Sequence, residues 1–151
     1  MLDEMEFRFQ SFKELIAQGR DEQGRVELSR LERAFCDAAD FDTERVMEGF
    51  LHPFIYRAER IPDVVWFFQV IGAAEIVTAI KSAFDALALE LGLPDSDGFG
   101  DRVFTVLEAS PVLNQHFDEW DAAYDRASGW AALLEEFLRS RNINPTQFWH
   151  S

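Results

Sequence analysis

Apolar residues recur at steps of three and four over most of the chain, which is the spacing that gathers side chains on one face of an α-helix. Such stripes predict helices over residues 2–16, 28–35, 47–55, 76–91, 113–127 and 130–138. The stretch 63–71 is apolar nearly all round, so its pattern fits either a buried helix or a buried strand. We interpret it as a helix, because the segments around it are helical and no partner strand is evident. The pattern of the short apolar segment 103–107 does not predict a single type of secondary structure.

Polar and special residues mark where these helices begin and end. Asp40 or Asp42 is placed to cap the helix that contains the 47–55 stripe. Ser110 and Pro111 together give a strong start signal, because a capping hydroxyl is followed by proline at the first helical position. Residues 93–101, rich in Asp and Gly, form the clearest loop of the chain.

The composition supports a folded core. The chain has 151 residues, of which 48% are hydrophobic, including 15 Phe and 4 Trp. A chain of this length buries about 68–70% of the surface that its unfolded form exposes. There is no repeat, no low-complexity tract and no linker long enough to separate two domains. We therefore expect an all-α fold, with residues 1–151 forming a single compact domain of about six to eight helices.

The formal net charge is −14, from 28 acidic and 14 basic residues. A basic nucleic-acid-binding domain is therefore excluded, because contacts to phosphate need Lys and Arg. The most apolar run, residues 64–74, is shorter than the ~20 residues that span a bilayer. The acidic first residues do not resemble a signal peptide, and the single Cys36 forms no internal disulfide. We expect a soluble, cytoplasmic, bacterial-type protein without membrane contact.

Signatures of common enzyme classes are missing from the sequence, including GxSxG, HExxH and the phosphate-binding GxxxxGK[ST]. Glu44, Glu48 and His52 have spacings that would put all three on one helix face, where they could bind a metal. Such a pattern more commonly belongs to an ordinary surface or half-buried histidine that binds no metal. Cys36 has no nearby histidine and fits a small buried side chain. We expect no enzyme activity, no metal and no cofactor.

The charge is distributed unevenly along the chain. Residues 1–60 carry 14 acidic and 9 basic side chains, whereas residues 61–151 carry 14 acidic and only 5 basic ones. Residues 82–138 contain 12 acidic side chains and only two basic ones, Arg102 and Arg126, which gives this segment a net charge of −10. This part of the chain has few cations of its own to neutralise its carboxylates.

The predicted helix after Ser110 arranges some of these carboxylates in a row. If the stripe 113–127 faces the core, Asp118, Asp121 and Asp125 fall together on one flank, with rises of about 4.5 and 6 Å between them. Like charges at this spacing repel by a few tenths of a kcal/mol, so stability does not favour the row. The candidate partner-binding residues are Asp118, Asp121, Asp125, Glu119, Glu135, Glu136, Asp95, Asp97 and Asp101.

Two explanations of this acidity compete. Acidic surfaces keep proteins soluble without any partner. A rigid row of carboxylates also resembles a nucleic-acid backbone, which carries one phosphate per ~3.4 Å of each strand. A basic protein that binds phosphates with Lys and Arg could bind such a row instead.

Three segments carry a resemblance to a known family. Residues 44–56 read ERVMEGFLHPFIY, residues 63–87 read DVVWFFQVIGAAEIVTAIKSAFDAL, and residues 113–125 read LNQHFDEWDAAYD. These segments resemble the bacterial DMP-type DNA-mimic proteins and the larger domain-of-unknown-function family that contains them. The shared features are a Gly-Phe element followed by aromatics, an Ile-Gly-Ala turn before an alanine-rich helix, and an acidic-aromatic segment. Where that family typically has Asn-Gly-Gly-Phe, residues 47–50 read Met-Glu-Gly-Phe.

The resemblance implies an all-helical acidic protein, capable of forming a homodimer, that imitates duplex DNA toward a DNA-binding protein. Our leading hypothesis is a non-enzymatic protein that occupies the nucleic-acid-binding surface of a basic partner, such as a regulator or nucleoid protein. One alternative is an immunity protein that neutralises a nuclease toxin. A further alternative is a metal-binding protein or enzyme that uses Glu44, Glu48 and His52. The aromatic pair Phe148 and Trp149 is a candidate dimer contact.

Overall fold

The computed structural model describes residues 2–92 and 98–150, which form ten α-helices, one short 3-10 helix and no strand. The elements are α1 (Phe12–Arg20), α2 (Gly24–Glu27), α3 (Arg30–Glu48), α4 (His52–Tyr56), η1 (Ala58–Arg60), α5 (Ile61–Val70), α6 (Ala74–Leu91), α7 (Phe99–Ala109), α8 (Pro111–Arg126), α9 (Ala131–Ser140) and α10 (Pro145–His150). The all-α prediction is confirmed. The helices outnumber the expected six to eight, because α2, α4 and α10 are too short to show a periodic pattern.

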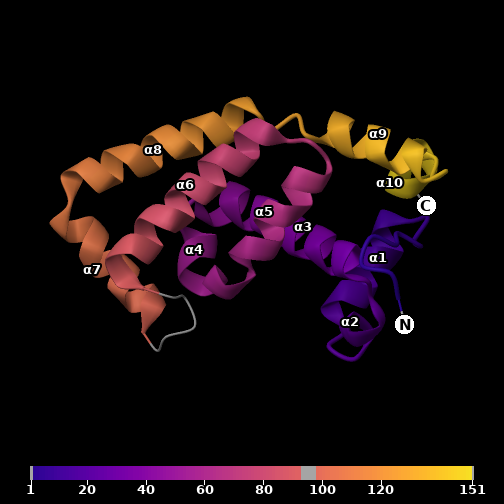
Figure 1. Cartoon of the computed structure of the whole chain (residues 1–151), viewed down its shortest axis with the longest axis horizontal. Coiled ribbons are helices and arrows are strands. Elements are labelled where there is room, and N and C mark those ends of the chain that lie inside the picture. Colours follow the sequence, from indigo (N-terminus) through magenta and orange to yellow (C-terminus); the bar gives the residue numbers. More distant parts are fainter. Residues whose placement is uncertain (1, 93–97, 151) are drawn as a thin grey trace.

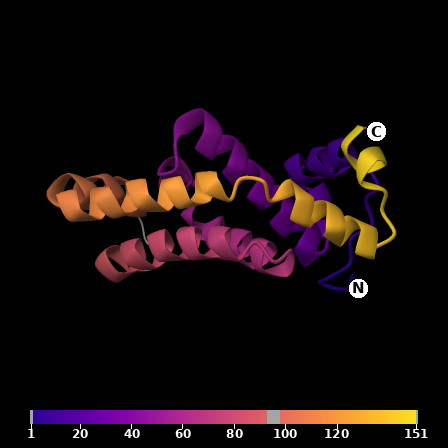
Figure 2. The same cartoon turned by 90° about the horizontal axis from the view of Figure 1, so that it is seen from above.

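Helix α5 lies between two helical layers. It packs against α3 on one side and α6 on the other, and α6 in turn packs against α8. Its buried residues are Ile61, Val64, Phe67 and Phe68. This position explains why residues 63–71 are apolar nearly all round, and it confirms their interpretation as a helix. The molecule is elongated, with α8 and α9 following one another along one long side and both termini at the same end (Figures 1 and 2).

The first helix begins ten residues later than the apolar pattern predicts. Ser11 caps it by accepting a hydrogen bond from the backbone N–H of Glu14, so α1 begins at Phe12 and not near Leu2. The residues before Ser11 run without helix along the start of α3, where the N–H of Leu31 donates to the carbonyl of Glu4 at 2.9 Å. The apolar spacing in this segment therefore arises from packing in a non-helical conformation.

Helix α3 takes in most of the predicted helix 28–35 and runs on to Glu48, which gives it 19 residues. It begins with a capping box, in which Ser29 and Glu32 each accept a hydrogen bond from the other's backbone N–H. The cap predicted at Asp40 or Asp42 is wrong, because both residues lie inside this helix. The helix ends at Glu48 and is followed by Gly49, whose φ of 102° suits glycine. The predicted stripe 47–55 is not one helix, because Gly49 divides it between the end of α3 and α4, and Met47 is exposed.

The start of α8 is as predicted. The Ser110 hydroxyl accepts from the N–H of Leu113 at 3.2 Å, and Pro111 occupies the first turn. The unassigned piece 103–107 belongs to α7, which begins at Phe99 and so takes up the last part of the predicted loop. Residues 93–97 of that loop lie outside the described residues.

The aromatic tail packs into the core and does not form an exposed patch. Phe148 is fully buried, and its ring lies 5.9 Å from that of Phe35 and 6.0 Å from that of Phe12. Trp149 is half-buried and packs 5.1 Å from Phe12. These rings join α10 to α1 and α3 within one chain, so the candidate dimer contact at Phe148 is used internally.

Cys36 is buried, as predicted, and burial raises the pKa of its thiol from 9.0 to about 12. The thiol of the unfolded chain therefore ionises first, and the free energy of unfolding falls as the pH rises from about 9 to 12. We expect this alkaline loss to be smaller in Cys36→Ala than in the unchanged protein, measured by urea unfolding at several pH values. If the free energies of unfolding of the two proteins fell equally as the pH rises, the raised pKa of the Cys36 thiol would be contradicted.

Candidate partner-binding surface

The acidic row predicted on α8 divides into more and less exposed carboxylates. Asp118 and Glu119 are exposed, and the Asp125 side chain is 67% exposed. Asp121 is less accessible, with its side chain 42% exposed. Phe117 and Tyr124 are buried, and Asp118, Asp121 and Asp125 lie on the flank of the helix beside this buried face, with Asp121 nearest to it.

The other predicted site residues lie on neighbouring elements. Asp101 is exposed in the first turn of α7, and Glu136 is exposed on α9. Glu135 lies 3.9 Å from Arg139 one turn further along α9. Asp95 and Asp97 fall outside the described residues. Helices α8 and α9 follow one another along one side of the molecule (Figure 2), which we call the acidic edge.

Arg45 of α3 reaches across to α8 and contacts two members of the row. Its Nε and Nη2 donate to Oδ1 of Asp121 at 3.0 and 2.8 Å. Its Nη2 also lies 3.1 Å from Oδ1 of Asp125. The Arg45 side chain is only 15% exposed and its guanidinium lies 5.3 Å from the centre of the Tyr124 ring. One cation from the N-terminal part of the chain therefore compensates part of the charge on α8.

The environment of Arg45 favours its charged form. Partial burial by itself lowers the pKa of the guanidinium, but hydrogen bonds and charges from Asp121 and Asp125 outweigh it, so the pKa lies above its usual value. Arg45 therefore stays positively charged beside the two carboxylates. It also fixes the side chains of Asp121 and Asp125 in position.

A second polar contact joins the same two helices. The Tyr124 hydroxyl donates to Oδ1 of Asp42 at 2.6 Å, and Tyr124 is fully buried. Burial, followed by the charge of Asp42 and the hydrogen bond to it, raises the pKa of the Tyr124 hydroxyl. Tyr124 thus stays protonated and able to donate. Together with Arg45, it sets how α8 is rotated against α3.

The alternative site at Glu44, Glu48 and His52 is assembled only in part. The three residues do not share a helix face, because α3 ends at Glu48 and His52 starts α4. His52 Nδ1 lies 3.1 Å from Glu44 Oε2, and Arg57 also contacts the Glu44 carboxylate. Glu48 is exposed and makes no ion pair with another described residue. Among the described residues no group of three or more His, Cys, Asp or Glu is arranged to hold a metal ion.

Sequence reasoning missed Arg45. It lies 76 residues before Asp121, and helical spacing relates only residues on the same helix. One signal was present, since Arg45 is the last basic residue of α3 and sits three residues after Asp42. That spacing puts both side chains on one face of the helix, although it does not reveal which helix they meet.

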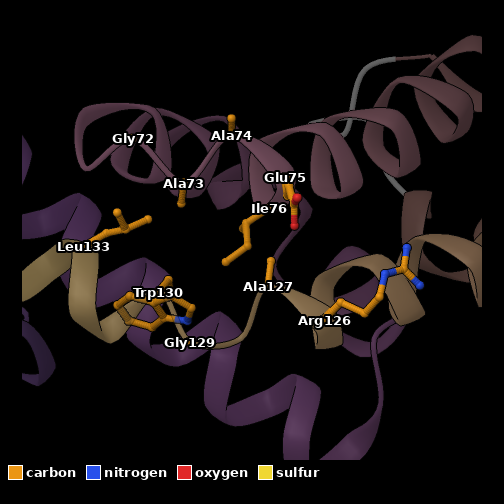
Figure 3. Close-up of a pocket in the computed structure, with 10 residues that line it drawn as sticks. All are labelled: Gly72, Ala73, Ala74, Glu75, Ile76, Arg126, Ala127, Gly129, Trp130 and Leu133. Carbon is orange, nitrogen blue, oxygen red and sulfur yellow. The ribbon is translucent and has the colours of Figure 1, made fainter.

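A pocket of about 420 Å³ lies beside this edge, between the turn that joins α5 to α6 and the junction of α8 and α9. Figure 3 shows Ile76 and Trp130 extending towards one another there, with Leu133 beside Ala73. The guanidinium of Arg126 extends away from these apolar side chains (Figure 3). The pocket is lined mainly by apolar residues, and Glu75 and Arg126 also belong to its lining.

Comparisons with known proteins bear on this surface. A family model described as DMP19-like protein matches residues 26–141. Neither the curated proteins nor the solved structures give a match. The matched region contains α3, α8 and the contact between them. None of the helices in the described part of the chain is both long and apolar enough to cross a membrane.

The Arg45 contact yields a test of stability. Replacing Arg45 with Met removes the charged hydrogen bonds that join α3 to α8, and we expect the free energy of unfolding to fall by about 1–2 kcal/mol. Lys81→Met is the matched control, because it removes one positive charge from an exposed position in the middle of α6. We expect a change within about 0.5 kcal/mol for the control. Equal effects of the two substitutions in urea unfolding would show that the contact contributes nothing.

Proposed function

The chain belongs to the DMP19-like protein family, and on this premise we propose that it is a non-enzymatic protein that occupies the nucleic-acid-binding surface of a basic partner. The observation that carries the proposal is the acidic edge along α8, which presents Asp118, Glu119 and Asp125 to solvent. The partner is a DNA-binding protein, such as a regulator or nucleoid protein, whose Lys and Arg side chains otherwise contact phosphates.

The spacing of the carboxylates supports this proposal. Asp118, Asp121 and Asp125 follow one another at rises of about 4.5 and 6 Å along α8. These rises are of the same order as the rise of DNA, which carries one phosphate of each strand per ~3.4 Å of helix axis. The proposed surface also includes Glu135 and Glu136 of α9, Asp101 of α7, and Asp95 and Asp97.

Arg45 fixes two members of the row, Asp121 and Asp125. It contacts Oδ1 of both Asp121 and Asp125, which leaves Oδ2 of each carboxylate for a cation of the partner. A surface whose side chains are already held in place loses less conformational entropy on binding. The contact with Arg45 therefore lowers the net negative charge of the row, but it also makes the side chains of Asp121 and Asp125 more rigid.

The apolar pocket between α8 and α9 adds a second kind of contact. Charged rims mostly accelerate and orient association, whereas affinity depends on a few buried apolar or aromatic side chains. We expect a partner that binds along α8 to extend to the pocket at the α8–α9 junction, which is lined by Ile76, Trp130 and Leu133. We expect one apolar side chain of the partner to enter it.

Removing the charge of the row tests the proposal. We expect the triple variant Asp118→Asn, Asp121→Asn, Asp125→Asn to bind its partner at least about tenfold more weakly, and with a flatter dependence on salt concentration. The variants serve as baits in affinity capture from a lysate of the source organism, with elution by increasing salt. The second variant, Asp118→Asn with Glu119→Gln, leaves the Arg45 contact intact and is expected to act in the same direction.

The matched control is Glu14→Gln, Glu22→Gln, Glu27→Gln. It removes the same charge from exposed positions on α1, α2 and the turn between them, at the other end of the molecule. We expect it to bind like the unchanged protein. If the control and the α8 variants lose binding equally, net charge alone drives association and the proposed surface is wrong.

Competition by duplex DNA tests the nature of the partner. We expect captured proteins to be DNA-binding and to be released when duplex DNA is added. A nuclease toxin as the captured protein would favour the immunity function instead. Captured proteins that are released neither by salt nor by duplex DNA would contradict the proposal.

A further inference from the structure

A cluster of arginines lines a pocket far from the acidic edge. The pocket has a volume of about 430 Å³ and is lined by Arg25, Arg30, Arg33, Arg60, Asp37 and Asp63. These residues come from α2, the first half of α3, η1 and the start of α5. Four cations against two carboxylates leave a charge of +2, in a protein whose formal net charge is −14.

Asp37 forms the base of this cluster. It is buried, and its Oδ1 accepts from Arg25 Nη2 at 2.8 Å and from Arg60 Nη1 at 3.4 Å. Arg25 is fixed further by a hydrogen bond from its Nη1 to the carbonyl of Gly19 at 3.0 Å. One carboxylate therefore holds two guanidinium groups and neutralises only one of them.

The remaining two arginines are less engaged. Arg30 lies over the ring of Trp66 at 4.0 Å, which orients its guanidinium. Its distances to Asp63 and Glu4 are 3.8 and 4.0 Å, longer than hydrogen bonds. Arg33 is exposed and forms no ion pair with another described residue. The N–H groups of both side chains are thus available to a ligand.

Stability alone does not explain this arrangement. Arg30 and Arg33 lie in the first turns of α3, where the helix dipole is positive and cations are unfavourable. Two further guanidinium groups nearby add to the repulsion. An anion bound among them would relieve both effects, and guanidinium groups bind carboxylate and phosphate oxygens through paired hydrogen bonds.

We propose that this pocket binds a doubly charged oxyanion of a small molecule, either a phosphoryl group or a pair of neighbouring carboxylates. The group would contact Arg30 and Arg33, with Arg25 and Arg60 held beneath it by Asp37. A charge of −2 on the ligand matches the +2 of the pocket. The site is independent of the acidic edge, so the protein can carry a small ligand and a basic partner together.

Calorimetric titration of the full chain at constant ionic strength tests this site. The probes are inorganic phosphate and malonate, which separate the phosphoryl from the carboxylate source, and sodium chloride serves as the blank. We expect saturable binding of at least one probe with a dissociation constant of about 1 mM or below. Arg33→Gln is expected to weaken that binding by at least about fivefold, and Arg30→Gln by about tenfold.

Lys81→Gln, which removes one exposed cation from the middle of α6, is the matched control and is expected to bind like the unchanged protein. Arg33→Gln breaks no ion pair among the described residues, so its effect does not depend on a change in folding. The absence of saturable heat with both probes would overturn the proposal. So would an equal loss of binding in Lys81→Gln, because binding would then follow net charge and not the pocket.

Discussion

The contact of Arg45 with Asp121 and Asp125 links the fold of this protein to its surface. The guanidinium is nearly buried between α3 and α8, so it has little water and depends on the two carboxylates for its hydrogen bonds. The same contact determines which carboxylates of α8 remain for a partner. Asp118 and Glu119 are exposed and untouched by Arg45, whereas Asp121 and Asp125 each share one oxygen with it.

The rest of the fold holds this contact in place. Helix α5 is apolar on both sides and spaces α3 from α6, and α6 carries α8. The Tyr124 hydroxyl bound to Asp42 fixes the rotation of α8. Because the buried side chains form one connected cluster, a shift of α5 would be transmitted to the acidic edge. The arginine pocket lies at the other end of α3, where a different set of ion pairs performs a similar ordering role.

Local patterns predicted what depends on a single helix. The start of α8 at Ser110 and Pro111, its buried stripe and the outward carboxylates all follow from spacing along one element. Contacts between elements could not be predicted in this way. The non-helical start, the continuity of α3 through Asp40 and the arrival of Arg45 at Asp121 each depend on partners far away in the sequence. The net charge counted over residues 82–138 therefore overestimates the uncompensated negative charge on α8, because Arg45 lies outside that segment.

A double-mutant cycle between Arg45→Met and Asp121→Asn tests this account most directly. The free energies of unfolding of the two single variants, the double variant and the unchanged protein give the coupling between the two side chains. The account predicts a coupling of about 1 kcal/mol or more for Arg45 with Asp121, and none for Arg45 with Asp118. A coupling near zero for Asp121, or an equal one for Asp118, would contradict the division of the row into held and unheld carboxylates.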